Sequence, residues 1–503
     1  MKSTQNPKPG TRNPELKTRN SKPDTMKTFL FYDLETTGLN KAFDQVLQFA
    51  AIRTDLTLDE IERHQIRIRL RPDVVPSPQA ILTNRISMDN ALSGQCEYDA
   101  VRYIHSLMNT PGTISLGYNT LGFDDEFLRF SFHRNLLSPY THQYENGCGR
   151  TDLLPITILY YLYKPEALNW PEVDGFPSIK LEHLSRTNNL AAGPAHDAMV
   201  DVEATVSLAR RLSREETMWT FLGGYFDKTS DRARTHKIPT AFRTEAGAHQ
   251  KALAIGNEFG HRNHFQAPVL SIGQSVPYSN QTLWLRLDLP ELRQTTPGTI
   301  EKCTWVIRKK FGEPVILLPP FDRYWDRLEK DRTAEAERNL AWLQSEPDRF
   351  QQIISHHRQF RYPEIPDLDA DAALYQNGFP SKADQQICRQ FHNAGSAEKT
   401  DLTGRFSKTW LRELAIRLLG RNVPEALSPP LRKHFDNYMA RINPAEDKDA
   451  LRDYRGEARS TPAAVLKEID RCRHSPAIST EDTKLLDDLA TYIRDRFDNP
   501  RIP

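Results

Sequence analysis

The sequence has few cysteines and no long apolar stretch, and each absence excludes a class of protein. Its 503 residues include five cysteines, an odd number. They are widely spaced and none belongs to a Cys-x-x-Cys pair, which argues against a disulfide framework and against a zinc site. No run of about 18 apolar residues is present, so we expect no transmembrane helix and no membrane partner. A reducing cytoplasm is the natural compartment for such a chain.

Net charge is also nearly absent. The 67 basic and 66 acidic side chains give a formal charge of +1. So weak an average field neither requires nor excludes a polyanionic partner, and local basic patches would have to bind one. Arg67, Arg69 and Arg71 alternate with apolar residues, and we interpret them as the solvated face of a strand rather than a track for a polyanion.

Hydrophobic patterning divides the chain into four regions, predicted as 1–26, 27–222, 223–365 and 366–503. The first is rich in Lys, Asn, Pro and Thr and lacks an apolar core, so we expect a disordered tail rather than a secretory signal, and translation could start at Met1 or Met26. In the second, strands are predicted at 28–32, 45–55, 61–71 and 113–117, and helices at 124–137, 153–163, 180–188 and 196–212. This order predicts an α/β domain with a mixed sheet covered by helices. Short β-rich runs at 268–289 and 303–318 predict a small β-domain, and the chain turns helical beyond about 330.

Three acidic segments in the α/β region point to metal chemistry. Asp33 and Glu35 follow a buried strand, and residues two apart in a strand point to the same face. Both carboxylates therefore converge where a hard divalent cation could be held by oxygen ligands. A single Asp-x-Glu pair is usually a solvated cluster. Here, however, Asp124 follows further along the chain, and His196 with Asp201 opens the last predicted helix.

These five residues, Asp33, Glu35, Asp124, His196 and Asp201, resemble in order and context the three motifs of the DnaQ-like DEDDh exonucleases. Further segments resemble bacterial exonuclease I over about residues 27–222, among them 117–119, 123–126, 169–171, 181–184 and 196–199, and weaker echoes such as 375–379 continue beyond. The resemblance implies an RNase H-like exonuclease domain, an SH3-like β-domain and a C-terminal α-helical domain. The chain departs from the family at Thr37, where an aromatic residue is frequent, and at Lys180, where arginine is usual. Lysine cannot form the bidentate fork of arginine, so the details of strand binding differ there.

The resemblance implies exodeoxyribonuclease I activity: metal-dependent 3′-to-5′ hydrolysis of single-stranded DNA to 5′-mononucleotides, in DNA repair and recombination. Two Mg²⁺ ions, with Mn²⁺ as a possible substitute, would be held by Asp33, Glu35, Asp124 and Asp201. His196 would act as general base, because its reference pKa of about 6.5 suits proton transfer near neutral pH. Substrate contacts are expected at Glu35, Lys180, Arg129, Tyr140 and Tyr144.

A protein partner is also implied, namely the acidic C-terminal tail of single-stranded DNA-binding protein. The candidate cations flank the apolar run 315–318 and are Arg308, Lys309, Lys310, Arg323, Arg327 and Lys330. They are equally compatible with solvated charges beside a β-core. We expect a monomer. Two alternatives stay open, an RNA-directed or proofreading DEDD exonuclease and a non-catalytic DNA-binding adaptor that keeps a nuclease fold.

Overall fold

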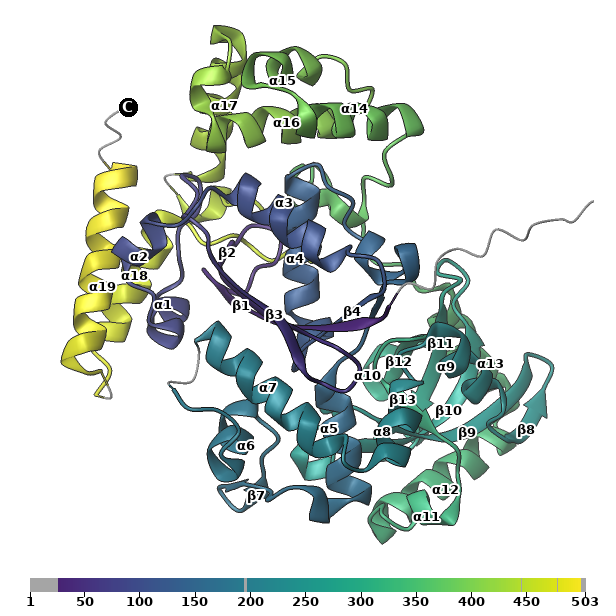
Figure 1. The fold of residues 1–503 in the computed structure, drawn as a ribbon. Helices are drawn as coiled ribbons and strands as arrows, with labels where there is room; N and C mark the ends of the chain where they lie inside the picture. Colours follow the sequence, from purple (N-terminus) through teal and green to yellow (C-terminus); the bar gives the residue numbers. More distant parts are fainter. Residues whose placement is uncertain (1–25, 194–196, 445, 477, 499–503) are drawn as a thin grey trace, which may run out of the picture.

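The computed structural model describes residues 26–193, 197–444, 446–476 and 478–498 (Figure 1). The tail predicted at 1–26 and the candidate base His196 lie outside these ranges, apart from Met26. Within the described ranges, no helix combines the length and the apolar character needed to cross a bilayer.

A five-stranded mixed sheet forms the centre of the first domain, as predicted. Its order is β3-β2-β1-β4-β5, and β1 is antiparallel to β2 but parallel to β4. The strands are β1 (Thr28–Thr36), β2 (Val46–Thr54), β3 (Glu60–Arg67), β4 (Thr113–Leu116) and β5 (Gly149–Arg150). The third strand is shorter than predicted, because the chain leaves the sheet after Arg67 and Ile68 pairs with Gln95 instead.

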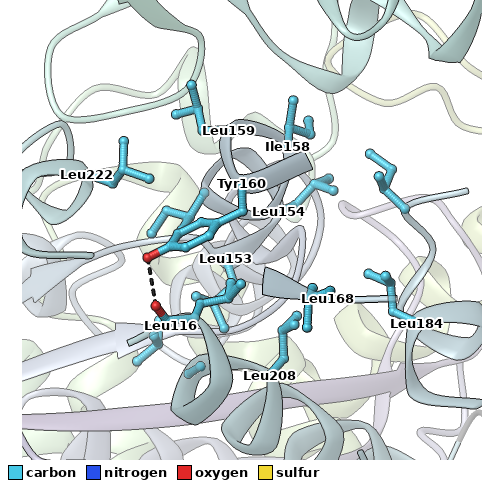
Figure 2. Packing of buried hydrophobic residues seen from close by; sticks show 14 of the residues in the cluster. Leu116, Leu153, Leu154, Ile158, Leu159, Tyr160, Leu168, Leu184, Leu208 and Leu222 are labelled. Atoms are coloured by element: carbon cyan, nitrogen blue, oxygen red, sulfur yellow. Dashed lines mark hydrogen bonds between the residues drawn. The ribbon is translucent and has the colours of Figure 1, made fainter. Parts of the chain in front are cut away.

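Helices cover both faces of this sheet (Figure 1). One face carries α3 (Glu97–Met108) and α4 (Asp124–Arg134), and the other carries α5 (Leu153–Tyr163), α6 (Leu181–Asn188) and α7 (Ala198–Leu212). Alternate residues of β1 face opposite layers: Phe31 packs with the α5 and α7 side chains, whereas Leu30 and Tyr32 pack with those of α3 and α4. In the α5 layer, the Tyr160 hydroxyl donates a hydrogen bond to the Leu212 carbonyl at 2.7 Å (Figure 2).

A second, antiparallel sheet confirms the predicted β-domain. Its order is β12-β11-β10-β9-β13, and β8 also pairs with β9. The strands are β8 (Thr240–Thr244), β9 (Gly247–Ile255), β10 (Gln266–Gln274), β11 (Gln281–Arg286), β12 (Val306–Lys310) and β13 (Ile316–Leu318), and the helices that accompany them are α8 (Glu216–Gly223), α9 (Lys228–His236), α10 (Ile300–Cys303), α11 (Asp322–Trp325), α12 (Lys330–Ser345) and α13 (Pro347–Gln359). Apolar residues of α12 and α13 pack on β10 and β11.

The last region is helical, as predicted, and returns to the first domain at two places (Figure 1). Its helices are α14 (Lys382–Asn393), α15 (Ser396–Thr403), α16 (Thr409–Asn422), α17 (Pro429–Ile442), α18 (Pro462–Arg473) and α19 (Thr480–Ile493). The first four pack near α3 and α4. The pair α18–α19 packs on two short helices that follow β3, α1 (Pro78–Asn84) and α2 (Met88–Leu92), in one apolar cluster.

A buried network of ion pairs joins the helical region to the first domain. Arg421 of α16 lies 2.8 Å from Asp73 and also pairs with Asp371, and Arg71 lies 3.2 Å from Asp73. All four side chains are almost fully buried. Arg71 therefore does not share the solvated face predicted for it, whereas Arg67 and Arg69 are exposed. Removing one member of such a buried pair leaves an uncompensated charge and costs about 3–5 kcal/mol.

Buried histidines at the same contact make the stability of the fold depend on pH. The Nε2 atom of His133 donates to the Ala370 carbonyl at 2.9 Å, and that of His392 donates to the Leu136 carbonyl at 3.1 Å. Burial lowers the pKa of each imidazole to about 4, whereas the pKa in an unfolded chain is about 6.5. The unfolded chain therefore binds more protons in this interval, and the stability held above about pH 6.5 is lost as the pH falls toward 4.

We expect thermal unfolding at pH 5 to occur several degrees below that at pH 7.5, with each buried histidine costing about 1.4 kcal/mol per pH unit below its unfolded pKa. His133→Gln, which keeps a donor but cannot be protonated, should show a lower melting temperature at pH 7.5 and a weaker dependence on pH. Calorimetric melts of both proteins at the two pH values test this. Equal pH dependence in the two proteins would contradict it.

Candidate active site

The first two candidate ligands lie at the end of β1 and face α7. Asp33 and Glu35 have the same parity in the strand as Phe31, whose side chain packs against the α5–α7 layer. Asp201 projects from the first turn of α7. Carboxylate oxygens of Asp33, Glu35 and Asp201 lie within 4.8 Å of one another. The structure thus brings Asp33 and Glu35 together with Asp201, which lies more than 160 positions further along the chain.

The fourth predicted ligand, Asp124, begins α4 and is 5% exposed. Burial raises the pKa of Asp124 well above its usual range, and the Leu34 backbone of β1, which acts to lower it, lies beside the carboxylate. Asp124 is therefore next to the strand that carries Asp33 and Glu35. The loop before it approaches β1 closely, since a Cβ on Gly117 would lie 2.5 Å from the Tyr32 carbonyl oxygen. Glycine is therefore required at this position of the loop.

The electrostatics of this cluster favour a bound cation. Burial, followed by the charge of Asp124 and then that of Asp201, raises the pKa of Asp33 well above its usual range. Burial, followed by the charges of Asp201 and Asp124, raises the pKa of Glu35 to about 9. Buried carboxylates that repel one another in this way offer only oxygen ligands, the donor set that Mg²⁺ and Mn²⁺ prefer. The residues present therefore fit a divalent metal site.

Two further aspartates, which were not among the predicted site residues, support this carboxylate cluster. Asp152, the N-cap of α5, accepts hydrogen bonds from the backbone N–H groups of Asn119 and Leu121 at 2.9 and 3.0 Å, so it holds the loop that precedes Asp124. Asp197, the N-cap of α7, adds a negative charge near Asp33 and Glu35. An aspartate directly before a helix is a recognisable cap, and for Asp152 this was the available signal.

The predicted strand-binding residues occupy three environments. Lys180 is exposed at the start of α6. Tyr140 and Tyr144 line a groove of about 620 Å³ between the first domain and the helical region. The Arg129 guanidinium is bound to the buried Asp125, with Nε at 2.8 Å, and its side chain is only 13% exposed. The structure therefore brings the two tyrosines together but directs Arg129 to a partner inside the protein.

Part of the predicted tail-binding surface is wrong. Lys309 is 1% exposed and its Nζ lies 2.6 Å from Asp231. This cation is therefore already paired inside the protein and cannot contact a peptide at the surface. The apolar run 315–318 is buried and offers no surface pocket: Val315 and Leu317 lie in the β-domain core, and Ile316 and Leu318 lie in the apolar cluster that includes α5 and α7. The physical reason is that this run enters β13, a strand that pairs with the central β9. Arg323 and Arg327 are exposed, as that prediction requires.

Comparisons with known proteins agree with this geometry. Residues 30–209 match the exonuclease family, and residues 368–496 match the exonuclease I C-terminal domain family. Exodeoxyribonuclease I of Escherichia coli strain K12 is 29% identical over 424 residues, which cover 80% of this chain and 86% of that relative. The structure of E. coli exonuclease I in complex with a dA16 oligonucleotide has a TM-score of 0.80 at 25% identity, covering 93% of this chain and 100% of the other.

A further structure, of SSB/exonuclease I in complex with the inhibitor CFAM, has a TM-score of 0.78 at 24% identity and covers 94% of this chain and 100% of the other. The two family matches fall on the first domain and on the C-terminal helices. Residues 30–209 thus form an exonuclease domain and residues 368–496 an exonuclease I C-terminal domain, and the chain is similar to exodeoxyribonuclease I over 80% of its length.

Proposed function

We propose that this chain hydrolyses single-stranded DNA from its 3′ end and releases 5′-mononucleotides, and that it serves DNA repair and recombination. The observation that carries the proposal is the convergence of Asp33, Glu35 and Asp201 within 4.8 Å at the end of β1. Asp124 adds a fourth buried carboxylate from α4. The oligonucleotide bound to the E. coli relative supports single-stranded DNA as the substrate class.

Two Mg²⁺ ions, or Mn²⁺ in their place, are the proposed cofactors, and Asp33, Glu35, Asp124 and Asp201 would hold them. When bound, such ions neutralise charge that builds on the scissile phosphate and lower the pKa of water. The chain itself holds the carboxylates at fixed positions on β1, α4 and α7. His196, which precedes the cap of α7 in the sequence, is the proposed general base that takes a proton from the attacking water.

The groove beside α4 is the proposed path of the strand. Tyr140 and Tyr144 line it from the first domain, and Tyr375 and Phe379 line it from the helical region. Tyr144 is 69% and Phe379 is 76% exposed, so both rings are available for stacking. Aromatic stacking tolerates any base sequence, which suits an enzyme that degrades whatever strand it holds. We propose that the exposed Lys180 contacts phosphates. Glu35 and Arg129 are further proposed contacts, and Arg129 would make its contact while it is paired with Asp125.

The proposal is tested by assaying purified protein on matched single-stranded DNA, single-stranded RNA and duplex DNA, with Mg²⁺ or with EDTA. We expect Mg²⁺-dependent release of 5′-mononucleotides from DNA that carries a free 3′ end, and much slower release from the other two substrates. Faster hydrolysis of RNA would instead identify an RNA-directed enzyme. Binding of single-stranded DNA without any metal-dependent hydrolysis would identify a non-catalytic adaptor and overturn the proposal.

We also propose that the chain binds the acidic C-terminal tail of single-stranded DNA-binding protein, as the SSB/exonuclease I structure supports. Among the candidate cations that are not buried, Arg323 and Arg327 lie beside Phe321, which is 49% exposed, and form the surface we propose. Arginines can pair with the tail carboxylates while an apolar surface receives its terminal side chain. Such contacts are screened over about 8–10 Å at physiological salt, so binding should weaken as salt rises.

We expect a fluorescent peptide that copies this tail to bind at low salt, and Arg323→Glu with Arg327→Glu to weaken binding about tenfold or more, as loss of charge-assisted hydrogen bonds implies. Hydrolysis of naked single-stranded DNA should be unchanged. The matched control is Arg412→Glu with Arg471→Glu, which alters net charge equally on exposed faces of α16 and α18. No binding by the wild type at low salt would remove the partner, and tight binding by the first double variant would remove these residues.

We also propose that the protein is located in the cytoplasm and acts as a monomer. All five cysteines are free thiols in the structure, which is consistent with a reducing compartment.

A further inference from the structure

The first turn of α4 carries three consecutive acidic residues, and each contacts a different part of the molecule. Asp124 faces β1, where its carboxylate lies beside the Leu34 backbone. Asp125 and Glu126 take no place among the proposed metal ligands, yet Asp125 is fully buried and the Glu126 side chain is only 14% exposed. Buried carboxylates are retained only with specific partners, so the identity of these partners shows what the turn is connected to.

Asp125 connects the turn to the β-domain. Its carboxylate accepts hydrogen bonds from Arg150 Nη1 at 2.6 Å and from His142 Nε2 at 2.9 Å, and it also pairs with Arg129. The other terminal nitrogen of Arg150 lies 2.8 Å from Glu313, in the turn between β12 and β13. That turn is itself anchored, because the Gly312 N–H donates to Asp231 at 2.8 Å. One arginine therefore links α4 to a fixed point of the second domain.

Glu126 connects the turn to the helical region. Its Oε1 atom accepts hydrogen bonds from two hydroxyls, that of Tyr375 at 2.9 Å and that of Tyr454 at 2.7 Å. Its Oε2 atom lies 3.3 Å from Arg455 and 3.4 Å from Lys41. Tyr375 is 42% exposed and lines the proposed strand groove, whereas Tyr454 is absent from the groove lining. A single hydroxyl thus connects a groove-lining ring to the turn that begins with Asp124.

We infer that Glu126 is a positioning residue for the metal ligand Asp124, and that the Tyr375 hydroxyl links strand occupancy of the groove to that position. The inference rests on the proposed function. Residues 124 and 126 belong to one helical turn, which moves as a unit, so a shift of Glu126 displaces the Asp124 carboxylate. A displacement of about 1 Å at a reacting centre can cost about a hundredfold in rate. Partners of metal ligands are in general worth about 10–100-fold in metal affinity or activity.

The decisive variants alter Glu126 and its two tyrosine partners. Glu126→Ala should lower kcat on single-stranded DNA by about 10–100-fold and raise the Mg²⁺ concentration for half-maximal activity, with KM within about twofold. Glu126→Gln keeps an acceptor oxygen and should recover part of both losses. Tyr375→Phe and Tyr454→Phe should each lower kcat by about 3–10-fold, because each removes a hydrogen bond to the charged Glu126. Tyr375→Phe also removes the longer hydrogen bond that Arg129 Nη1 donates to this hydroxyl at 3.4 Å.

The matched control is Tyr98→Phe, which also removes one hydroxyl hydrogen bond, to His392 at 2.9 Å, but leaves the first turn of α4 untouched. Its kcat and Mg²⁺ requirement should equal those of the wild type. A Mn²⁺ titration by calorimetry, without DNA, provides a second measurement, in which Glu126→Ala should bind more weakly and Tyr98→Phe normally. Thermal melts establish that each variant is folded.

Three outcomes would overturn the inference. Folded Glu126→Ala with unchanged kcat and Mn²⁺ affinity would show that Glu126 only fills an interface. A loss confined to KM would make it a strand-binding residue. Equal effects of Tyr98→Phe and Tyr375→Phe would mean that any interface hydroxyl matters. If the wild type itself degrades no single-stranded DNA, the proposed function fails, and the Mn²⁺ titration still decides whether Glu126 positions Asp124.

Discussion

Asp33→Asn is expected to abolish hydrolysis of single-stranded DNA, with a loss of about 10³-fold or more, while binding of the strand persists. Asp33 is central to the cluster with Glu35 and Asp201, and its substitution removes an anionic ligand without changing the shape of the side chain. Loss of one preorganised electrostatic contact to the transition state already costs about 10²–10³-fold in enzymes. Initial rates with Mg²⁺ test the loss of hydrolysis, and fluorescence anisotropy in EDTA tests whether the strand still binds. Turnover near the wild-type rate by the folded variant would refute the site assignment.

The same substitution should stabilise the metal-free fold. Because burial and the neighbouring carboxylates raise the pKa of Asp33 and of Glu35, the folded chain holds more protons than the unfolded chain above about pH 4. These groups therefore lower the free energy of unfolding as the pH rises. In EDTA at pH 8, Asp33→Asn should melt several degrees above the wild type, and Mg²⁺ should stabilise it less. Identical melting temperatures and identical stabilisation by Mg²⁺ in the two proteins would mean that repulsion between the carboxylates does not destabilise the metal-free fold.

His196→Ala is expected to lower kcat by about 10²–10⁴-fold, the usual contribution of a general base. The proposed metal ligands Asp33, Glu35, Asp124 and Asp201 are untouched, so Mn²⁺ binding in a calorimetric titration should match that of the wild type. The acidic limb of the pH–rate profile, which reports deprotonation of the base, should disappear. A variant with the wild-type rate and an unchanged profile would show that His196 has a structural role instead.

A control separates loss of the base from damage to its surroundings. Asp197 caps α7 through the N–H groups of Met199 and Val200, and His196 precedes it directly in the sequence. Asp197→Asn keeps the capping oxygen, so its melting temperature should stay close to that of the wild type. If His196→Ala melts far below Asp197→Asn, its loss of rate reflects disruption of the helix start rather than loss of a proton acceptor.

The sequence predicted the site better than its surroundings, for reasons that specific residues illustrate. The α5 helix was predicted at its observed bounds, because an apolar run ends before Pro165 and leaves little choice. The carboxylates of Asp33 and Glu35 were predicted together because strand parity is a local property. Lys309 was misassigned, since its partner Asp231 is 78 positions away and periodicity reveals a buried face but not a partner.

For the acidic residues beside Asp124 as well, the sequence did not reveal the partners that the fold brings to them. Segment 123–126 is part of the family resemblance, but it did not predict which residues Asp125 and Glu126 contact. Their importance comes from Arg150, Tyr375 and Tyr454, which only the fold brings to them. The groove is likewise a product of tertiary structure, because Tyr144 and Phe379 lie on segments separated by more than 230 residues.

The return of α18–α19 to α1 and α2 has a consequence for synthesis of the protein. Leu47, Val75 and Ile81 belong to the first domain, yet they share an apolar cluster with Ile469 and with residues of α19. Until the ribosome has translated these helices, one side of the nascent α/β domain exposes the apolar surface that they cover. Exposed surface of this kind invites aggregation and chaperone binding. A fragment that ends before residue 462 would therefore keep this apolar surface exposed and tend to aggregate, although it contains every carboxylate of the site.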